Sequence, residues 1–211
     1  MSKKKKYYAV KVGNETGIFD NWDDCSKQVH GFSGAIYKKF DTLAEAESYM
    51  NVHEALFSER YDSEEEVMES LADGEAFAYV DGSNLGDGSK FSWGIVLFTN
   101  EGKVNISGQS DDERFTPHRN VSGELFASVN ATNYAIKQGL NKIIICHDFS
   151  GIRHWALGEW ETESNLAKFY KAFYQKAMKS IDVQFVKADG HTGDKFNEEA
   201  DLLAKEALGL L

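Results

Sequence analysis

Apolar and polar residues alternate over the C-terminal two thirds of the chain in short runs that predict strands, separated by turns and by longer helical patterns. The predicted strands are residues 77–81, 93–98, 104–108, 142–147 and 181–185. After the third of them, apolar residues recur at helical spacing over residues 122–138, and further helical patterns follow the last two strands. A meander of three strands followed by alternating helices and strands predicts an α/β fold, a mixed five-stranded sheet flanked by helices.

The first fifty residues carry a second and smaller pattern. In order, it predicts a strand over 7–12, a turn over 13–17, a returning strand at 18–19, a helix over 22–29, a strand over 35–40 and a helix that begins at the capping box 42–45. These elements predict a small α+β module with a slight core.

A segment rich in acidic residues lies between the two patterns. Residues 51–74 carry one basic and eight acidic side chains and few large apolar ones, which predicts a solvated linker that is partly helical over 67–71. We therefore expect three parts: a module over 1–50, an acidic linker over 51–74 and a larger domain over 75–211.

The net charge of −11 argues at first against a nucleic-acid partner, because phosphate binding depends on Lys and Arg. Most of that charge lies in the predicted linker, so the argument loses its force for the two flanking parts. No apolar run is long enough to span a bilayer and the start has no secretion-signal pattern, so we expect a cytoplasmic protein without a membrane partner. We also expect a monomer. Cys25 and Cys146 have neither metal-finger nor disulfide spacing and are expected to be reduced.

Four carboxylates occupy positions that could converge. Asp81 and Asp148 each follow a predicted strand, and a tight turn is expected at Gly82-Ser83 directly after Asp81. Glu124 and Asp201 lie early in predicted helices. Crowded carboxylates repel one another and raise some of their pKa values, a cost that divalent cations remove. The pattern therefore indicates a metal-dependent site that cleaves phosphodiesters, with two Mg²⁺ ions as the expected cofactor and Mn²⁺ as a possible substitute.

Short fragments make these indications more specific. In chain order, the larger domain contains Asp81-Gly82-Ser83, Gly123-Glu124-Leu125, His147-Asp148, Gly190-His191-Thr192-Gly193 and Asn197-Glu198-Glu199-Ala200-Asp201. In this order they resemble type 1 ribonuclease H. The module contains Tyr-Tyr-Ala-Val-Lys, Gly-Ile-Phe, Trp-x-x-Cys and Tyr37-Lys38-Lys39-Phe40, which resemble the RNA/DNA hybrid-binding domain at the N-terminus of eukaryotic-type ribonucleases H.

The resemblance implies an endonuclease that hydrolyses the RNA strand of RNA/DNA hybrids by a two-metal-ion mechanism and leaves 5′-phosphate and 3′-hydroxyl ends. Asp81 would bridge both ions, Glu124 and Asp148 would hold one, and Asp201 the other. His191 would shuttle protons or assist product release.

Contacts to nucleic acid are also implied by position. Those to the RNA strand are Gly82, Ser83, Asn84 and Asn120, although Asn120 could equally cap the following helix. In the module, Tyr8 and Trp22 or Tyr37 would pack on the DNA strand, and Lys38 and Lys39 would reach phosphates.

Two other functions remain open, a non-catalytic hybrid-binding protein and a transposase- or integrase-like nuclease core. One departure from the family pattern also matters. Residues 158–163 form a short acidic segment where many members carry a basic protrusion. We therefore expect the larger domain to bind hybrids weakly by itself and the module to supply affinity.

Overall fold

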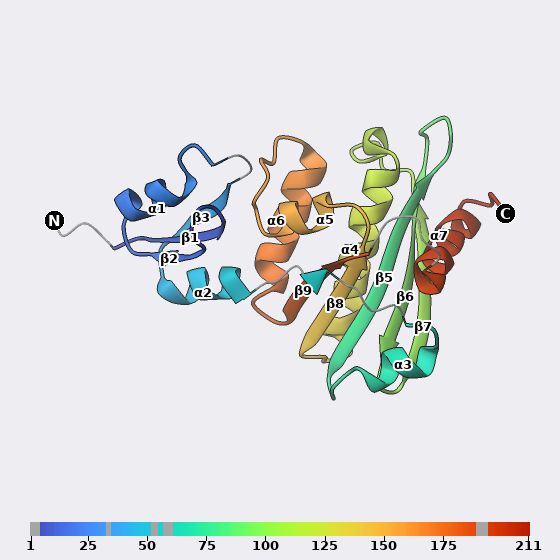
Figure 1. Cartoon of the computed structure of the whole chain (residues 1–211). Coiled ribbons are helices and arrows are strands. Elements are labelled where there is room, and N and C mark those ends of the chain that lie inside the picture. Colours follow the sequence, from blue (N-terminus) through green and yellow to red (C-terminus); the bar gives the residue numbers. More distant parts are fainter. Residues whose placement is uncertain (1–4, 33–34, 52–54, 57–60, 189–193) are drawn as a thin grey trace. The chain divides into compact units, whose positions relative to one another are not determined.

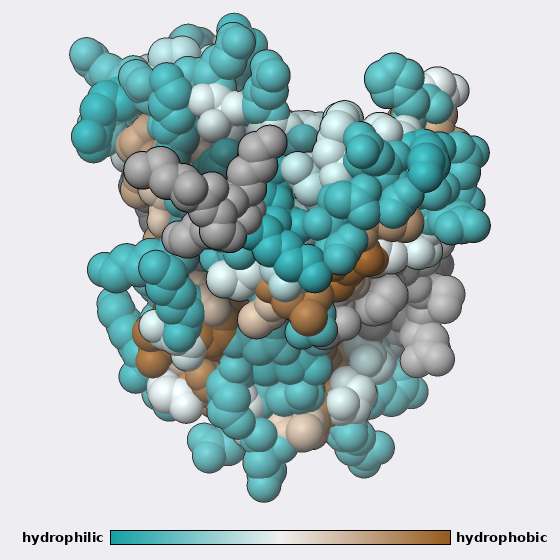
Figure 2. Space-filling view, turned by 90° about the vertical axis from the view of Figure 1, so that its left-hand side faces the viewer, coloured by the Kyte–Doolittle hydropathy of each residue, from teal (hydrophilic) through white to brown (hydrophobic). Residues whose placement is uncertain are grey.

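The computed structural model describes residues 5–32, 35–51, 55–56, 61–188 and 194–211. The chain forms two compact units, Met1–His53 and Glu54–Leu211. Within the described part, no helix combines the length and the apolar character needed to cross a membrane. Much of the face seen in Figure 2 is hydrophilic.

The N-terminal unit is built on a three-stranded antiparallel sheet in the order β2-β1-β3. Its elements are β1 (Tyr7–Val12), β2 (Gly17–Phe19), α1 (Trp22–Val29), β3 (Ile36–Phe40) and α2 (Leu43–Asn51), in agreement with the predicted order. Val10 packs with Cys25 and Val29 of α1. The ring centroids of Phe40 in β3 and Tyr49 in α2 are 5.2 Å apart. Because neighbouring strand residues point to opposite faces, the two helices cover opposite faces of this sheet.

The C-terminal unit contains the predicted mixed sheet. Its strands are β5 (Glu75–Asn84), β6 (Phe91–Thr99), β7 (Gly102–Ser110), β8 (Lys142–His147) and β9 (Asp182–Lys187), in the order β9-β8-β5-β6-β7. The β5-β6-β7 pairs are antiparallel and the β5-β8-β9 pairs parallel. A two-residue strand, β4 (Ala55–Leu56), extends the sheet by pairing in parallel with β9.

Helices cover both faces of this sheet (Figure 1). The short helix η1 (Thr116–His118) leads into α4 (Asn120–Lys137), which packs on β5 and β6 and is flanked by α5 (Gly151–Ala156) and α6 (Asn165–Ala177). On the other face, α7 (Lys195–Ala207) packs on β5, β6 and β7. Phe196 and Ala200 of α7 belong to a buried cluster with Phe77 and Tyr79 of β5.

Part of the predicted linker instead joins this core. Helix α3 (Glu64–Glu69) is capped by Ser63, and Val67 and Leu71 are buried in the same cluster as Phe77. Lys103 of β7 holds α3 through an ion pair with Glu64 of 2.7 Å. The expectation of a solvated segment is therefore wrong for residues 61–71, whose apolar side packs into the core while Glu65, Glu66 and Glu69 are exposed.

We predict that Val67→Ala lowers the free energy of unfolding of the C-terminal unit by about 1–3 kcal/mol, because a fully buried side chain leaves a cavity. Glu69→Ala, on the exposed side of the same helix, serves as the control. Chemical denaturation of both variants checks this; equal stability of the two would show that α3 does not contribute to the core.

Candidate active site

Two glycines bring the start of α4 into direct contact with the sheet. A Cβ atom on Gly82 of β5 would lie 2.2 Å from the backbone nitrogen of Glu124, and one on Gly123 would lie 2.1 Å from the backbone oxygen of Ser92. No side chain fits at such distances, so strand and helix meet backbone to backbone. This contact places Glu124 beside Asp81.

The strand that carries Asp81 is longer than predicted. β5 continues through Ser83 to Asn84, and these residues pair with β6. The chain turns only after Asn84, where Leu85 donates to the backbone oxygen of Lys90 at 3.0 Å. The expected tight turn at Gly82-Ser83 is therefore wrong: Gly82 serves helix packing, not chain reversal.

A third glycine admits α7 on the opposite face. Gly94 of β6 pairs with Asp81, and a Cβ atom on it would lie 2.0 Å from the backbone oxygen of Ala200. Ser92 adds a hydrogen bond from its Oγ to the backbone oxygen of Ala204, at 2.6 Å. α7 is thereby fixed against β6 next to Asp81. Asp201 lies near the middle of this helix, not early in it as expected.

Asp148 directly follows β8. The last pair between β5 and β8 is Tyr79 with Cys146, two residues before Asp81 and Asp148 respectively. Since the strands are parallel, both acids lie at the same edge of the sheet. Two strands and two helices therefore deliver the four predicted carboxyl groups to one region, where their charges act on one another.

Burial and mutual repulsion perturb this group. Burial, and then the charges of Asp148 and Asp201, raise the pKa of Asp81 to about 6, against a hydrogen bond from the Gly82 nitrogen of 2.6 Å that lowers it. Glu124 is 5% exposed, and its pKa is raised well above the ordinary value by burial and then by the charges of Asp81 and Asp148. Crowded carboxyl groups of this kind are a feature of sites that hold cations.

One lysine close to the site was not predicted from the sequence. Lys205 Nζ lies 2.5 Å from Asp201 Oδ2, and the charges of Asp201 and Asp81 contribute to a raised pKa of Lys205. The signal was present, since the two residues are four apart on one helix. On the same helix, Glu199 forms an ion pair with Lys103 at 2.9 Å.

The donor set suits a hard divalent cation. Asp and Glu oxygens are the ligands that Mg²⁺ prefers. Glu124 Oε2 is buried without a hydrogen-bond partner in the described part of the chain, a condition that a bound cation would relieve. As they lie in the structure, no three or more His, Cys, Asp or Glu side chains among the described residues form a group that could hold a metal ion. His191 lies outside the described residues.

The residues predicted to contact RNA lie on β5 beyond Asp81 and at the start of α4. Gly82, Ser83 and Asn84 continue the strand beyond Asp81. α4 begins at Asn120 itself, and the capping position belongs to Arg119, whose side chain makes no capping hydrogen bond. The alternative that Asn120 caps the helix is therefore wrong, and its side chain is exposed.

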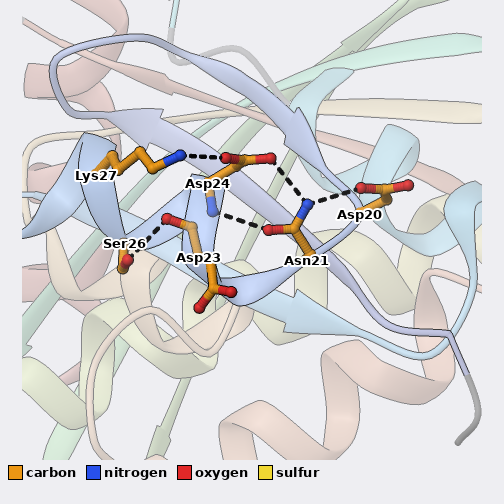
Figure 3. Close-up of polar contacts among 6 residues, drawn as sticks. All are labelled: Asp20, Asn21, Asp23, Asp24, Ser26 and Lys27. Atoms are coloured by element: carbon orange, nitrogen blue, oxygen red, sulfur yellow. Dashed lines mark hydrogen bonds and ion pairs between the residues drawn. The ribbon is translucent and has the colours of Figure 1, made fainter.

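In the N-terminal unit, three of the predicted binding residues form one aromatic cluster. The Trp22 ring lies 5.5 Å from that of Tyr8 and 5.7 Å from that of Tyr37, and Trp22 is 41% exposed. Asn21 caps the start of α1, which begins at Trp22, by accepting a hydrogen bond from the Asp24 backbone nitrogen at 2.9 Å (Figure 3).

The two predicted lysines of β3 lie on opposite faces of the sheet. Lys39 pairs with Tyr8 and therefore shares a face with the aromatic cluster. Lys38 points to the other face, where its Nζ lies 5.8 Å from the centre of the Tyr49 ring. The structure thus brings Lys39, but not Lys38, to the aromatic cluster.

The acidic segment 158–163 is less acidic on its surface than its composition indicates. Glu159 is buried and pairs with Arg153 at 3.1 Å and with His154 Nδ1 at 2.6 Å. Trp160 stacks on His154 with centroids 4.6 Å apart and remains 41% exposed.

The raised pKa of Asp81 predicts a pH-dependent loss of stability in metal-free protein. Between pH 4 and pH 6 the unfolded chain releases this proton while the folded chain retains it, so the free energy of unfolding falls as the pH rises. Asp81→Asn removes the charge and keeps an acceptor for the Gly82 nitrogen. At pH 8 in EDTA, it should raise the free energy of unfolding by on the order of 1–3 kcal/mol.

Denaturation at pH 4 and pH 8 measures this effect, with Asp182→Asn at an exposed position as the control. The parent and Asp81→Asn should differ little in free energy of unfolding at pH 4, where Asp81 is neutral. A lower stability of Asp81→Asn than of the parent at pH 8 would contradict the repulsion.

Comparison with known protein families places both units. The family described as "Ribonuclease H1 N-terminal domain" matches residues 6–50, and the family described as "RNase H" matches residues 73–209.

Individual proteins agree with these matches. Human ribonuclease H1 is 25% identical over 261 residues, covering 95% of this chain and 88% of the human protein. The ribonuclease H of Crithidia fasciculata is 54% identical over 52 residues, which are 25% of this chain and 10% of that protein. The crystal structure of LC11-RNase H1 in complex with RNA/DNA hybrid has a TM-score of 0.53 at 17% identity and covers 64% of this chain and 96% of its own. This likeness shows the fold.

Proposed function

The chain belongs to the ribonuclease H family, and from this premise we propose that it is a ribonuclease H that hydrolyses the RNA strand of RNA/DNA hybrids by a two-metal-ion mechanism, leaving 5′-phosphate and 3′-hydroxyl ends. The observation that carries the proposal is the group of four carboxyl side chains whose charges act on one another at one edge of the sheet. A surface that only bound phosphates would gain nothing from clustered negative charge.

The four acids divide the task of holding two cations. Asp81 would contact both, Glu124 and Asp148 one, and Asp201 the other. Bound Mg²⁺, or Mn²⁺ in its place, would supply an activated water and neutralise the leaving oxygen. Burial and the neighbouring charges raise the pKa of Glu124, and bound cations would lower it again and favour loss of the proton.

Substrate choice would be made by the groups beside the acids. Only RNA offers a 2′-hydroxyl as donor and acceptor. Gly82, Ser83 and Asn84 lie on β5 just beyond Asp81, and Asn120 is exposed at the start of α4. We assign these four to the RNA strand and His191 to proton transfer or product release.

The N-terminal unit would supply most of the affinity for the hybrid. The Tyr8, Trp22 and Tyr37 rings form a platform of the kind that stacks on nucleic acid, with Lys39 on the same face for phosphates. Lys38 would reach a phosphate only around the edge of the sheet, because β3 is an edge strand.

A cleavage assay tests the function. Labelled RNA/DNA hybrid, RNA duplex and DNA duplex are incubated with protein and Mg²⁺, and the experiment is repeated with Asp148→Asn. We expect cutting of the hybrid alone, with a loss of at least about 100-fold in rate in the variant. Glu198→Gln, an exposed acid of α7, is the matched control and should keep its activity.

Other outcomes identify the alternative functions. Binding without cutting would favour the non-catalytic hybrid-binding protein. Cutting of all three substrates would favour the transposase-like core.

Deletion of residues 1–50 should raise KM for the hybrid by about 10-fold or more and leave kcat within about twofold, because the removed unit contributes local concentration and not chemistry. Steady-state kinetics on the hybrid measure both constants. An unchanged KM would refute the assignment of affinity to the N-terminal unit.

A further inference from the structure

A network of buried hydroxyl groups joins α4 to α6. Ser128 Oγ lies 2.9 Å from the hydroxyl of Tyr170 and 2.5 Å from that of Tyr174. The Tyr174 hydroxyl also lies 2.9 Å from Thr132 Oγ1, which donates to the backbone oxygen of Ser128 at 2.9 Å. All four side chains are fully buried, so their hydroxyl groups make their hydrogen bonds with one another and with the backbone oxygen of Ser128, to which Tyr174 also donates at 3.1 Å.

The network lies along the same side of α4 as Glu124, one of the four acids of the candidate site. Glu124, Ser128 and Thr132 follow one another at intervals of four residues and so lie on the same side of the helix. Tyr170 is close enough to Glu124 for the two to interact, since the Glu124 charge adds to burial and to Tyr174 in raising the pKa of Tyr170. The hydroxyl groups of Ser128 and Thr132 therefore lie one and two helical turns from Glu124 along the same side of α4.

Hydrogen bonds fix the rotation of a helix more tightly than apolar contacts do, because they are directional. Side chains extend about 5–6 Å from a helix axis, so a rotation of about 10° displaces a carboxyl group by about 1 Å. A displacement of this size is enough to disturb a catalytic geometry. Gly82 and Gly123 set how closely α4 approaches the sheet, but two residues without side chains do little to resist rotation.

We propose that Ser128, Tyr170, Tyr174 and Thr132 form a positioning device that sets the rotation of α4 and thereby holds the Glu124 carboxyl group in place for the divalent cation. The proposal rests on the proposed function and deepens it. In this device, Ser128 Oγ contacts the hydroxyl groups of both tyrosines. Thr132 Oγ1 contacts the Tyr174 hydroxyl and donates to the backbone of α4.

The test uses the full-length protein and measures Mn²⁺ binding by isothermal titration calorimetry, together with KM and kcat for the hybrid. The main variant is Ser128→Ala/Tyr170→Phe, which removes both partners of one hydrogen bond and so limits the loss of stability. We expect Mn²⁺ to bind about 10-fold more weakly, as is typical when a group that orients a metal ligand is lost. kcat should fall at limiting Mn²⁺ while KM for the hybrid stays unchanged.

Two further variants distinguish a loss of positioning of Glu124 from a general loss of folding stability. Val183→Ala, a buried substitution on β9, should lower the melting temperature and leave the Mn²⁺ dissociation constant unchanged. Tyr170→Phe alone should give a smaller shift in the same direction as the double variant.

A double variant that binds Mn²⁺ as the parent does, or a Val183→Ala protein that weakens Mn²⁺ as strongly, would overturn the proposal. If the parent binds Mn²⁺ and the double variant binds it more weakly, but the parent does not cut the hybrid, then the proposed function fails and the positioning role stands.

Discussion

The arrangement of the acids depends on the backbone contact between β5 and α4 at Gly82 and Gly123. Each of these glycines faces a backbone atom at a distance that admits no Cβ. Gly94 provides the same close approach for α7 on the other face. Because α4 and α7 approach the sheet from opposite faces, three small residues allow acids from both sides to reach the region where Asp81 lies on β5 and Asp148 follows β8. Any side chain at these points would push a helix, and the acid it carries, away from the others.

The same convergence makes the site costly for the fold. Glu124 is buried and Asp81 is half-buried, and desolvation together with the neighbouring like charges raises the pKa of both. The cost is offset by the surrounding core, in which Phe77 and Tyr79 of β5 pack with Phe196 of α7 and with Val67 of α3. Helix α3 therefore matters to the site although it carries none of its residues. Functional sites commonly break local rules in this way and depend on good packing elsewhere.

The sequence predicted most of the elements and the convergence of the four acids, and its errors have identifiable causes. Long periodic runs such as 122–138 and 142–147 were placed within two residues of their observed bounds. Gly82-Ser83 looks locally like a turn, but pairing with β6 decides its conformation, and pairing is invisible in a short window. The acidic composition of residues 51–74 concealed the fact that Val67 and Leu71 are four apart and share one buried side.

Other features could have been predicted by applying strand periodicity to single residues. Consecutive residues of β3 must face opposite ways, so the separation of Lys38 from Lys39 follows from sequence alone once the strand is assigned. The buried hydroxyl network could not be predicted, because it depends on the relative positions of α4 and α6, which lie far apart in sequence. The same holds for the three glycine contacts, which join residues between 31 and 106 positions apart.

The central claim is that four carboxyl groups share one region and that divalent cations relieve their repulsion. Carbon-13 NMR of the side-chain carboxyl groups measures this directly, by titration of each acid with and without Mg²⁺. We predict that in metal-free protein Asp81 titrates near pH 6 and Glu124 above its ordinary range, and that both shift downward when Mg²⁺ is added. Ordinary titration of both residues, unchanged by Mg²⁺, would contradict the account.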